Sequence, residues 1–337
     1  MSVKRTLSFL LVWCVGLTST TAAMAQASSN LGFDKEAAAR NWWDLYFKNS
    51  QSVKLSDGRT INLMCEGQGS PVVILDAGMG NGAWTWRHVH IELARTTRVC
   101  AYDRSGYGQS SRSTSERTAG AEADELAELL ERAALPSPYI LVGRSYAAFI
   151  DRLYAHRHLN QVAALILVDS STEYQFTRFA SVYPDEAKKD AEALHARECL
   201  KSAQTGTLSN QCQVQPPRDL PASRADWWRQ QGPALAEAML LEYIDMNSTS
   251  SDQVSAERSL GSLPVLLLER DLPEEIWRQM HEETLSISSN SKLETVKGAG
   301  HQIQEDQPMA FVEAVNGVVS QVRAGNPSNE TNRRHKT

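Results

Sequence analysis

The stretch GRSYA at residues 143–147 constrains the fold of this chain more than any other. It follows the apolar run 139–142, which predicts a buried strand, and it precedes an apolar run that predicts a helix. A serine in a sharp turn from strand to helix presents its hydroxyl at the sheet edge, beside a helix N-terminus that stabilises negative charge. The small residues Gly143 and Ala147 allow so tight a turn. The stretch predicts a nucleophile at Ser145, although an ordinary serine in a turn would also fit these five residues.

Strands and helices alternate along the rest of the chain. We expect strands at residues 52–55, 60–65, 71–75, 98–102, 139–142, 163–168, 265–268 and 293–297. We expect helices at 83–93, 119–134 and 307–323, after a lead of helical character at 26–50. Asp57 and Gly58, between the first two strands, are typical of a hairpin turn. Such alternation predicts a mostly parallel sheet that helices cover on both faces.

One long segment, residues 171–262, interrupts this alternation. It is mostly helical and charged, and it is too long to be a loop of a compact domain. It predicts a helical cap inserted into the core. The expected division is therefore a signal peptide at 1–25, a core in two parts at 26–170 and 263–324 around the cap, and a disordered polar tail at 325–337.

The N-terminus predicts export. Lys4 and Arg5 precede the apolar run 7–17, which is too short to span a bilayer, and the small residues Ala23 and Ala25 favour cleavage after Ala25. An uncleaved anchor is the alternative. We expect an exported protein in a bacterial periplasm, with no stable membrane anchor once the signal is removed.

Composition excludes some classes of ligand. The chain of 337 residues has a net charge of −6 and no cluster of Lys and Arg with interleaved aromatics, which argues against binding to nucleic acid. Cleavage would remove Cys14 and leave four of the five cysteines. Because these four form neither a C-x-x-C motif nor a Cys/His cluster, we expect no metal site, and no motif predicts a cofactor.

Four segments that follow strands carry the chemistry. They are DAGMG at 76–80, YDRSGYG at 102–108, the Ser145 turn, and GAGH at 298–301. In this order and spacing they resemble the α/β-hydrolase family, from about residue 50 to residue 322. The resemblance implies an eight-stranded, mostly parallel sheet with helices on both faces and a helical cap. The chain departs from the family at Ala77 and at Arg144, where family members often have histidine.

The chemistry suggests a role for each group. A serine hydroxyl is a weak nucleophile and needs a base, and neutral His301 can accept its proton near pH 7. His88 and His90 lack comparable surroundings and are interpreted as residues of a helix surface. The backbone N–H groups of Met79 and Tyr146 are expected to form the oxyanion hole.

Two aspartates compete to orient His301. Asp169 follows the sixth strand, where some members of the family, including haloalkane dehalogenases, carry their acid. Asp271 follows the seventh strand, where most members carry it, but it comes soon after the strand and without the usual glycine-containing turn. We favour Asp169 and keep Asp271 as the alternative. Asp103 is expected to stabilise its own turn.

The resemblance also suggests how the cysteines pair. In the family's sheet the second strand lies beside the fourth, and these strands carry Cys65 and Cys100. Cys199 and Cys212 are close together within the cap. We therefore expect disulfides Cys65–Cys100 and Cys199–Cys212. Four buried free thiols are the alternative.

The favoured function is that of a serine hydrolase. It would cleave a carboxylic ester or lactone through a covalent acyl-enzyme, without a cofactor. Export and a large cap suggest a bulky external small molecule, such as a macrolide-type antibiotic. Two alternatives stay open, which are an amidase or aminopeptidase of the same fold and a non-catalytic ligand-binding protein on a hydrolase scaffold.

Overall fold

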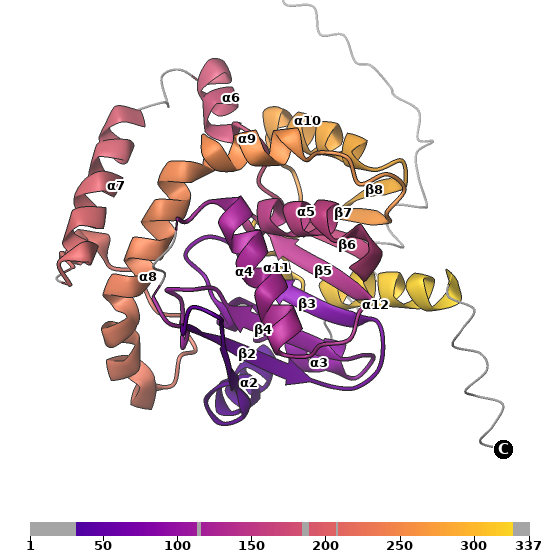
Figure 1. Cartoon of the computed structure of the whole chain (residues 1–337), viewed down its shortest axis with the longest axis horizontal. Coiled ribbons are helices and arrows are strands. Elements are labelled where there is room, and N and C mark those ends of the chain that lie inside the picture. Colours follow the sequence, from indigo (N-terminus) through magenta and orange to yellow (C-terminus); the bar gives the residue numbers. More distant parts are fainter. Residues whose placement is uncertain (1–31, 113–115, 184–188, 207, 326–337) are drawn as a thin grey trace, which may run out of the picture.

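The computed structural model describes residues 32–112, 116–183, 189–206 and 208–325. The expected signal peptide at 1–25 lies outside these residues, as does the expected tail apart from Gly325. The described chain forms one central sheet with helices on both sides and a group of helices at one end (Figure 1). Within the described ranges no helix is both long and apolar enough to cross a membrane.

The sheet has eight strands in the order β1-β2-β4-β3-β5-β6-β7-β8. Strand β2 pairs antiparallel with β1 and with β4, and the remaining neighbours pair parallel. The predicted α/β-hydrolase fold is thereby confirmed. The strands are β1 (Gln51–Lys54), β2 (Thr60–Glu66), β3 (Val72–Asp76), β4 (Val99–Asp103), β5 (Tyr139–Arg144), β6 (Val162–Val168), β7 (Val265–Glu269) and β8 (Ser291–Thr295).

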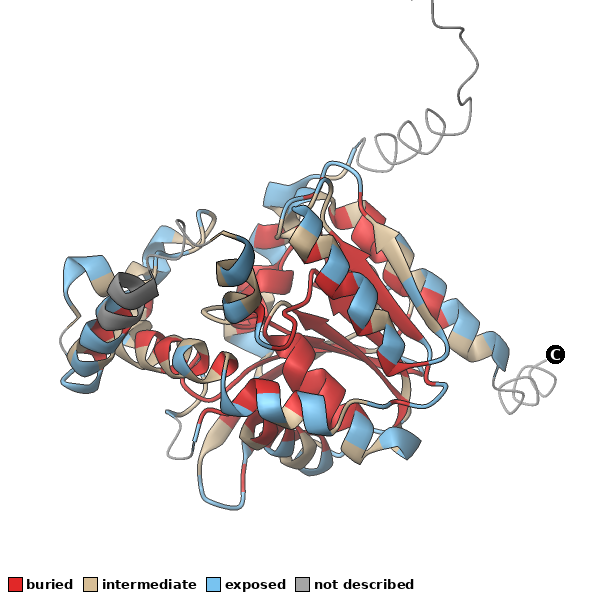
Figure 2. Cartoon of the chain, turned by 90° about the horizontal axis from the view of Figure 1, so that it is seen from above, coloured by how far each residue is buried: buried red, intermediate tan, exposed pale blue. Residues whose placement is uncertain are grey.

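Helices bury both faces of the sheet, and Figure 2 shows the strands buried between them. One face packs against α2, α3 and α12, and the other packs against α4 and α5. The core helices are α2 (Lys35–Asn49), η1 (Ala83–Trp86), α3 (His90–Ala94), α4 (Ala119–Arg132), α5 (Ala147–Arg157), η2 (Leu159–Gln161), α10 (Glu275–Thr284), η5 (Leu285–Ile287), α11 (Ile303–Asp306) and α12 (Pro308–Gly325).

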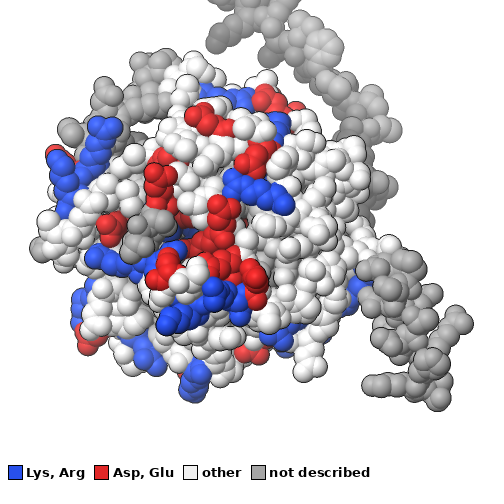
Figure 3. All heavy atoms as spheres, in the orientation of Figure 1, with Lys and Arg blue, Asp and Glu red and all other residues white. Residues whose placement is uncertain are grey.

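Local sequence explains several of these elements. Gly58 has a φ of 90° in the turn between β1 and β2, a conformation that glycine adopts without steric cost. Thr118 caps the N-terminus of helix α4, because its hydroxyl accepts a hydrogen bond from the N–H of Ala121 at 3.2 Å. Figure 3 shows acidic side chains gathered over α4, with Lys and Arg beside them.

The cap lies between β6 and β7. Helices α7 and α8 pack against each other around a small core of Ala196, Cys199, Ala203, Ala236 and Leu240. Its elements are α6 (Gln175–Val182), α7 (Lys189–Gln204), η3 (Asn210–Cys212), η4 (Ala222–Arg224), α8 (Ala225–Met246) and α9 (Thr249–Ala256).

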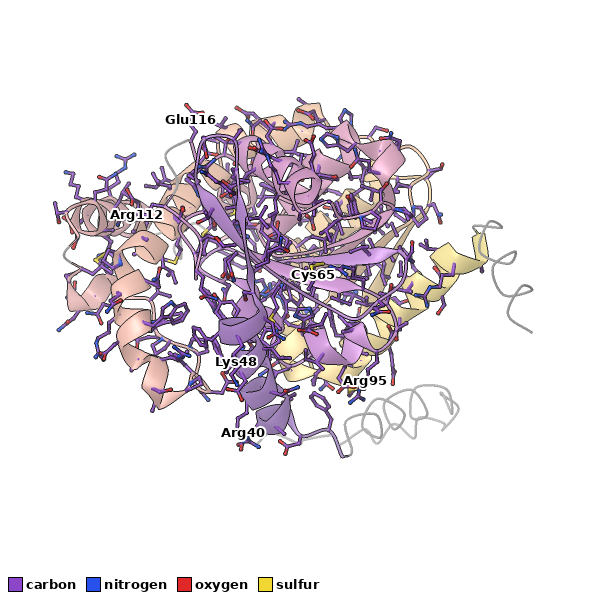
Figure 4. All side chains as sticks on the ribbon, turned by 60° about the horizontal axis from the view of Figure 1, so that its bottom comes forward. Arg40, Lys48, Cys65, Arg95, Arg112 and Glu116 are labelled. Carbon is purple, nitrogen blue, oxygen red and sulfur yellow. A yellow bond between two sulfur atoms is a disulfide. The ribbon has the colours of Figure 1, made fainter. Side chains whose placement is uncertain are left out.

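Both expected disulfides are present in the structure. Cys65 and Cys100 are direct neighbours in the antiparallel pair of β2 and β4, with their Cα atoms 4.0 Å apart. Figure 4 shows Cys65 within the sheet. Cys199 of α7 is bonded to Cys212 within the cap. The first bond therefore joins two strands of the core, and the second joins two segments of the cap.

Some local predictions were wrong. The helix expected at 83–93 is divided into η1 and α3, and His88 and His90 are buried instead of lying on a helix surface. His90 is fully buried, and both of its ring nitrogens have partners there. One accepts a hydrogen bond from Nε1 of Trp42 at 3.1 Å, and the other lies 3.0 Å from the carbonyl oxygen of Val99. Helix α10 was not predicted, and Gly325 ends α12 instead of beginning a tail.

Candidate active site

Ser145 lies in the sharp turn between β5 and α5. Its φ of 52° is in the left-handed region, which costs a residue other than glycine about 1–3 kcal/mol. Gly143 has to be glycine, because a Cβ there would lie 2.6 Å from Oδ2 of Asp151 and 3.0 Å from the backbone of Ala147. The turn therefore has the strained geometry that the pattern at 143–147 predicts.

Hydrogen bonds between strand ends bring Ser145 beside Asp169. The N–H of Ser145 donates to the carbonyl of Val168 at 3.0 Å, and the N–H of Asp169 donates to the carbonyl of Leu268 at 2.7 Å. Asp169 also has a left-handed φ, of 41°. The turns after β5, β6 and β7 thus lie at the same edge of the sheet.

The Asp169 carboxylate contacts His301 directly. Its Oδ2 lies 2.5 Å from Nδ1 of the ring. Arg270 holds the same carboxylate, through an ion pair of 2.9 Å to Oδ2 and a backbone N–H bond of 3.2 Å to Oδ1. The indole N–H of Trp277 lies 3.5 Å from Oδ1. Asp169 is completely buried, so these donors replace water around its charge.

The protonation states suit a base at His301. Burial acts to raise the pKa of Asp169, but the hydrogen bond from His301 and the charge of Arg270 outweigh it and hold the pKa at about 2. Burial lowers the pKa of His301. The hydrogen bond to Asp169 raises this pKa and the charge of Arg144 lowers it further, and the net result is a pKa below 6.5. At neutral pH the ionised Asp169 can only accept, so the proton of neutral His301 sits on Nδ1 and Nε2 is a free acceptor.

Asp271, the alternative acid, binds a different part of the loop. Its Oδ1 accepts from Nζ of Lys297 at 3.0 Å, and its Oδ2 accepts from the N–H of Gly298 at 3.0 Å. These bonds stabilise the turn that precedes His301. No hydrogen bond joins Asp271 to His301 in the part of the chain that the structure describes.

Asp103 also lies where the sequence suggests, inside its own turn. Its carboxylate accepts from the N–H of Ala83 at 2.7 Å, the hydroxyl of Tyr46 at 2.6 Å and the amide of Asn62 at 2.9 Å. Oδ2 also accepts from the N–H of Gln109 at 3.2 Å, within the turn that follows β4. Asp103 takes no part in the contact between Asp169 and His301.

The loop after β3 approaches Ser145 closely. A Cβ on Gly78 would lie 3.1 Å from Cβ of Ser145 and 2.8 Å from Nη1 of Arg144, so a larger residue there would have to displace the Arg144 side chain and press against Ser145. The N–H groups of Met79 and Tyr146 donate to no other residue in the described chain. Both donors are therefore available to a ligand beside Ser145, as an oxyanion hole requires.

Buried side chains support this loop from below. Arg104 donates to Oδ1 of Asp76 at 2.7 Å and to the carbonyl of Ala77, and the hydroxyl of Tyr107 accepts from the N–H of Gly80 at 3.1 Å. Sequence reasoning missed this role, although Arg104 and Tyr107 belong to the YDRSGYG turn. It also missed Arg270, for which the only signal was a cation directly after β7.

A pocket of about 570 Å³ opens beside the loop. Met79 and Gly80 line one side, and Gln302, which follows His301, lines another. The cap contributes Trp228 and Met239. Both core and cap therefore shape this space, and its volume is typical of sites for small molecules.

The structure brings one set of common metal-binding residues together. His195, Cys199 and Cys212 lie within 4.8 Å of one another, the one such group among the described residues. The two sulfur atoms are bonded to each other. They therefore offer no thiolate to a zinc ion.

Comparison with known proteins identifies the family. Residues 71–308 match the family described as "alpha/beta hydrolase fold". The match spans more than half of the chain and includes the strands that carry Ser145, Asp169 and the loop of Gly78. The chain belongs to the α/β-hydrolase family.

Individual proteins are also similar to this chain. The uncharacterised protein YqjL of Bacillus subtilis is 25% identical over 251 residues, which cover 72% of this chain and 81% of YqjL. A candidate lipase of Acinetobacter baumannii superposes with a TM-score of 0.64 at 19% identity, over 89% of this chain and 97% of its own. A candidate epoxide hydrolase of Pseudomonas aeruginosa superposes with a TM-score of 0.62 at 21% identity, over 83% of this chain and 98% of its own. At such identities the two structures show the shared fold alone.

Proposed function

We propose that this protein is a serine hydrolase that cleaves a carboxylic ester or lactone. The observation that carries the proposal is the bond of 2.5 Å between Asp169 and His301, at the same sheet edge where Ser145 occupies a left-handed turn. In the proposal Ser145 is the nucleophile, His301 the base and Asp169 the group that orients it. A serine in this turn, instead of an aspartate, disfavours the chemistry of epoxide hydrolases and dehalogenases.

The first half of the reaction forms an acyl-enzyme. Nε2 of His301 takes the proton of the Ser145 hydroxyl as Oγ attacks the carbonyl carbon. The negative charge that develops on the carbonyl oxygen is stabilised by the N–H groups of Met79 and Tyr146. The intermediate collapses when the C–O bond to the alcohol breaks and His301 donates its proton to the leaving oxygen.

Water completes the cycle. His301 removes a proton from a water molecule, which attacks the acyl carbon, and the second tetrahedral intermediate releases the carboxylic acid as Ser145 recovers its proton. Ionised Asp169 stabilises the imidazolium that forms in each half. In a lactone the leaving alcohol stays attached to the acid, so one product results.

We also place the activity outside the cytoplasm. The two disulfides favour an oxidising compartment, which fits the signal peptide expected at 1–25. The pocket beneath the cap suits a small-molecule substrate.

Hydrolysis rates on a panel of substrates test the function. The panel contains p-nitrophenyl esters, lactones and amides as three separate groups. The mature protein is expected to hydrolyse an ester or lactone, and Ser145→Ala to lower kcat by about 10⁴-fold or more. A fluorophosphonate should label the wild-type protein at Ser145 and leave Ser145→Ala unlabelled. Labelling of Ser145→Ala at the same rate would exclude Ser145 as the nucleophile, and turnover of amides alone would favour an amidase.

A further inference from the structure

One cation at the site has no partner. Arg144, the residue before Ser145, exposes only 2% of its surface. Its guanidinium makes no hydrogen bond or ion pair with any residue of the described ranges, and its Nε is buried without an acceptor. Burial lowers the pKa of Arg144 to about 10, so the side chain stays charged at neutral pH. Burying an unpaired charge is costly, and a bound anion would offset that cost.

Two other arginines near this site are paired. Arg270 forms an ion pair with Asp169 at 2.9 Å. Arg87 forms an ion pair with Glu305 at 2.7 Å. Glu305 and Asp169 are close enough to act on the charge of Arg144, but each is already engaged by another guanidinium. The five N–H donors of Arg144 therefore remain for a ligand or for water.

The guanidinium also lies close to Ser145, the proposed nucleophile. Its Nη1 is 2.8 Å from the position that a Cβ on Gly78 would take, and Cβ of Ser145 is 3.1 Å from the same position. The charge of Arg144 is close enough to His301 to lower the pKa of that ring. A group bound to Arg144 would therefore lie within a few bonds of the carbonyl that Ser145 attacks.

We propose that Arg144 binds a carboxylate of the substrate, so that the enzyme prefers esters that carry a free carboxylate near the scissile bond. This inference rests on the proposed hydrolase function. A guanidinium presents a planar pair of donors that matches a carboxylate. The oxyanion already has the N–H groups of Met79 and Tyr146 available, which leaves the full charge of Arg144 for a second, permanently anionic group.

Two nearly isosteric substrates test the preference. One is the mono-p-nitrophenyl ester of adipic acid, with a free carboxylate, and the other is the same ester with that carboxylate replaced by an amide. We expect kcat/KM to be about 10-fold or more higher for the anionic ester, since a charge-assisted hydrogen bond is worth that factor. In Arg144→Gln the ratio should fall to about one, and Arg144→Lys should retain part of it.

A surface arginine provides the matched control. Arg95, labelled at the edge of the molecule in Figure 4, has a side chain that is 73% exposed. Arg95→Gln removes the same charge from the protein and should leave the ratio unchanged. An equal loss of kcat/KM on both esters in Arg144→Gln would overturn the inference, because it would assign Arg144 to the oxyanion. A ratio near one in the wild-type protein would also overturn it.

Binding without turnover separates this inference from the proposed function. Ser145→Ala protein, titrated calorimetrically with adipate and with adipamide, should bind adipate about 10-fold or more tightly, and Arg144→Gln added to it should remove the difference. If no ester were hydrolysed but this preference appeared, the hydrolase function would fail and the anion site would stand. If Arg144→Gln did not fold, equal affinity of Ser145→Ala for the two ligands would still overturn the site.

Discussion

Glu242 of the cap helix α8 and Arg104 of the core form a buried ion pair, with Nη2 of Arg104 3.1 Å from Oε2 of Glu242. The same guanidinium donates to Asp76 and to the carbonyl of Ala77, in the loop that approaches Ser145. The hydroxyl of Tyr107 joins the two as well, because it donates to Glu242 at 2.8 Å. The cap and the proposed oxyanion loop are therefore connected through shared side chains.

This connection predicts that Glu242→Gln affects both stability and turnover. Glutamine keeps an acceptor oxygen but removes the charge that Arg104 and Arg117 share. Asp76 and Glu122 still pair with these arginines, so the change should cost about 1.5–3 kcal/mol in the free energy of unfolding, as hydrogen bonds to a charged group do. Because the loop loses support, kcat should fall by a larger factor than KM changes. Urea unfolding and steady-state kinetics measure the two effects.

Glu237, on the same helix, offers a control. Among the described residues it pairs with Arg112 alone, at 3.5 Å and near the surface, so Glu237→Gln should cost under about 1 kcal/mol. An unfolding free energy for Glu242→Gln that matched this control would show that the buried pair contributes little.

Neutralising the acid should separate Asp169 from Asp271. Asp169→Asn is expected to lower kcat by about 10⁴-fold, since the bond that sets the tautomer and orientation of His301 is lost. Asp271→Asn should cost less than about tenfold, because Asp271 binds Lys297 and Gly298 and not His301 among the described residues. Both variants are compared at equal concentrations of folded protein. Full activity in Asp169→Asn would exclude it as the acid.

The pH profile should reveal the state of His301. Only the neutral ring can accept the proton of Ser145, so kcat/KM should fall as the pH drops through the pKa of His301. Since that pKa lies below 6.5, the midpoint of the acid limb should also lie below pH 6.5. Arg144→Gln removes a positive charge that lowers this pKa, so the midpoint should move to higher pH. A midpoint above 6.5 in the wild-type protein would contradict the assignment.

The disulfide Cys199–Cys212 should stabilise the cap. Its sequence separation of 13 residues corresponds to at most about 3 kcal/mol from loop closure. The double variant Cys199→Ser/Cys212→Ser should lower the midpoint of urea unfolding, followed by tryptophan fluorescence, to which Trp227 and Trp228 of the cap contribute. Peptide mapping without reductant should find the pair in wild-type protein, and a pairing such as Cys65–Cys199 would contradict the structure.

Some features of this protein could be predicted from the sequence and others could not. The alternating strands and helices were predictable because hydrophobic periodicity and turn residues act over a few positions, as at Gly58 and Ser145. The prediction of one continuous helix at 83–93 was wrong. Packing against the core outweighs local helix propensity there, and the burial of His90 is an example of that packing. Helix α10 was missed for lack of a strong local signal.

Local sequence thus determined the order of the strands and the strained serine turn, and the resemblance to the family pointed to the candidates for base and acid. Only the tertiary structure decided which aspartate reaches His301, because that depends on how the turns after β6 and β7 meet at the sheet edge. It also left Arg144 unpaired and placed Glu242 against Arg104. Such relationships join residues far apart in the chain, and packing sets them in a way that no pattern of neighbouring residues encodes.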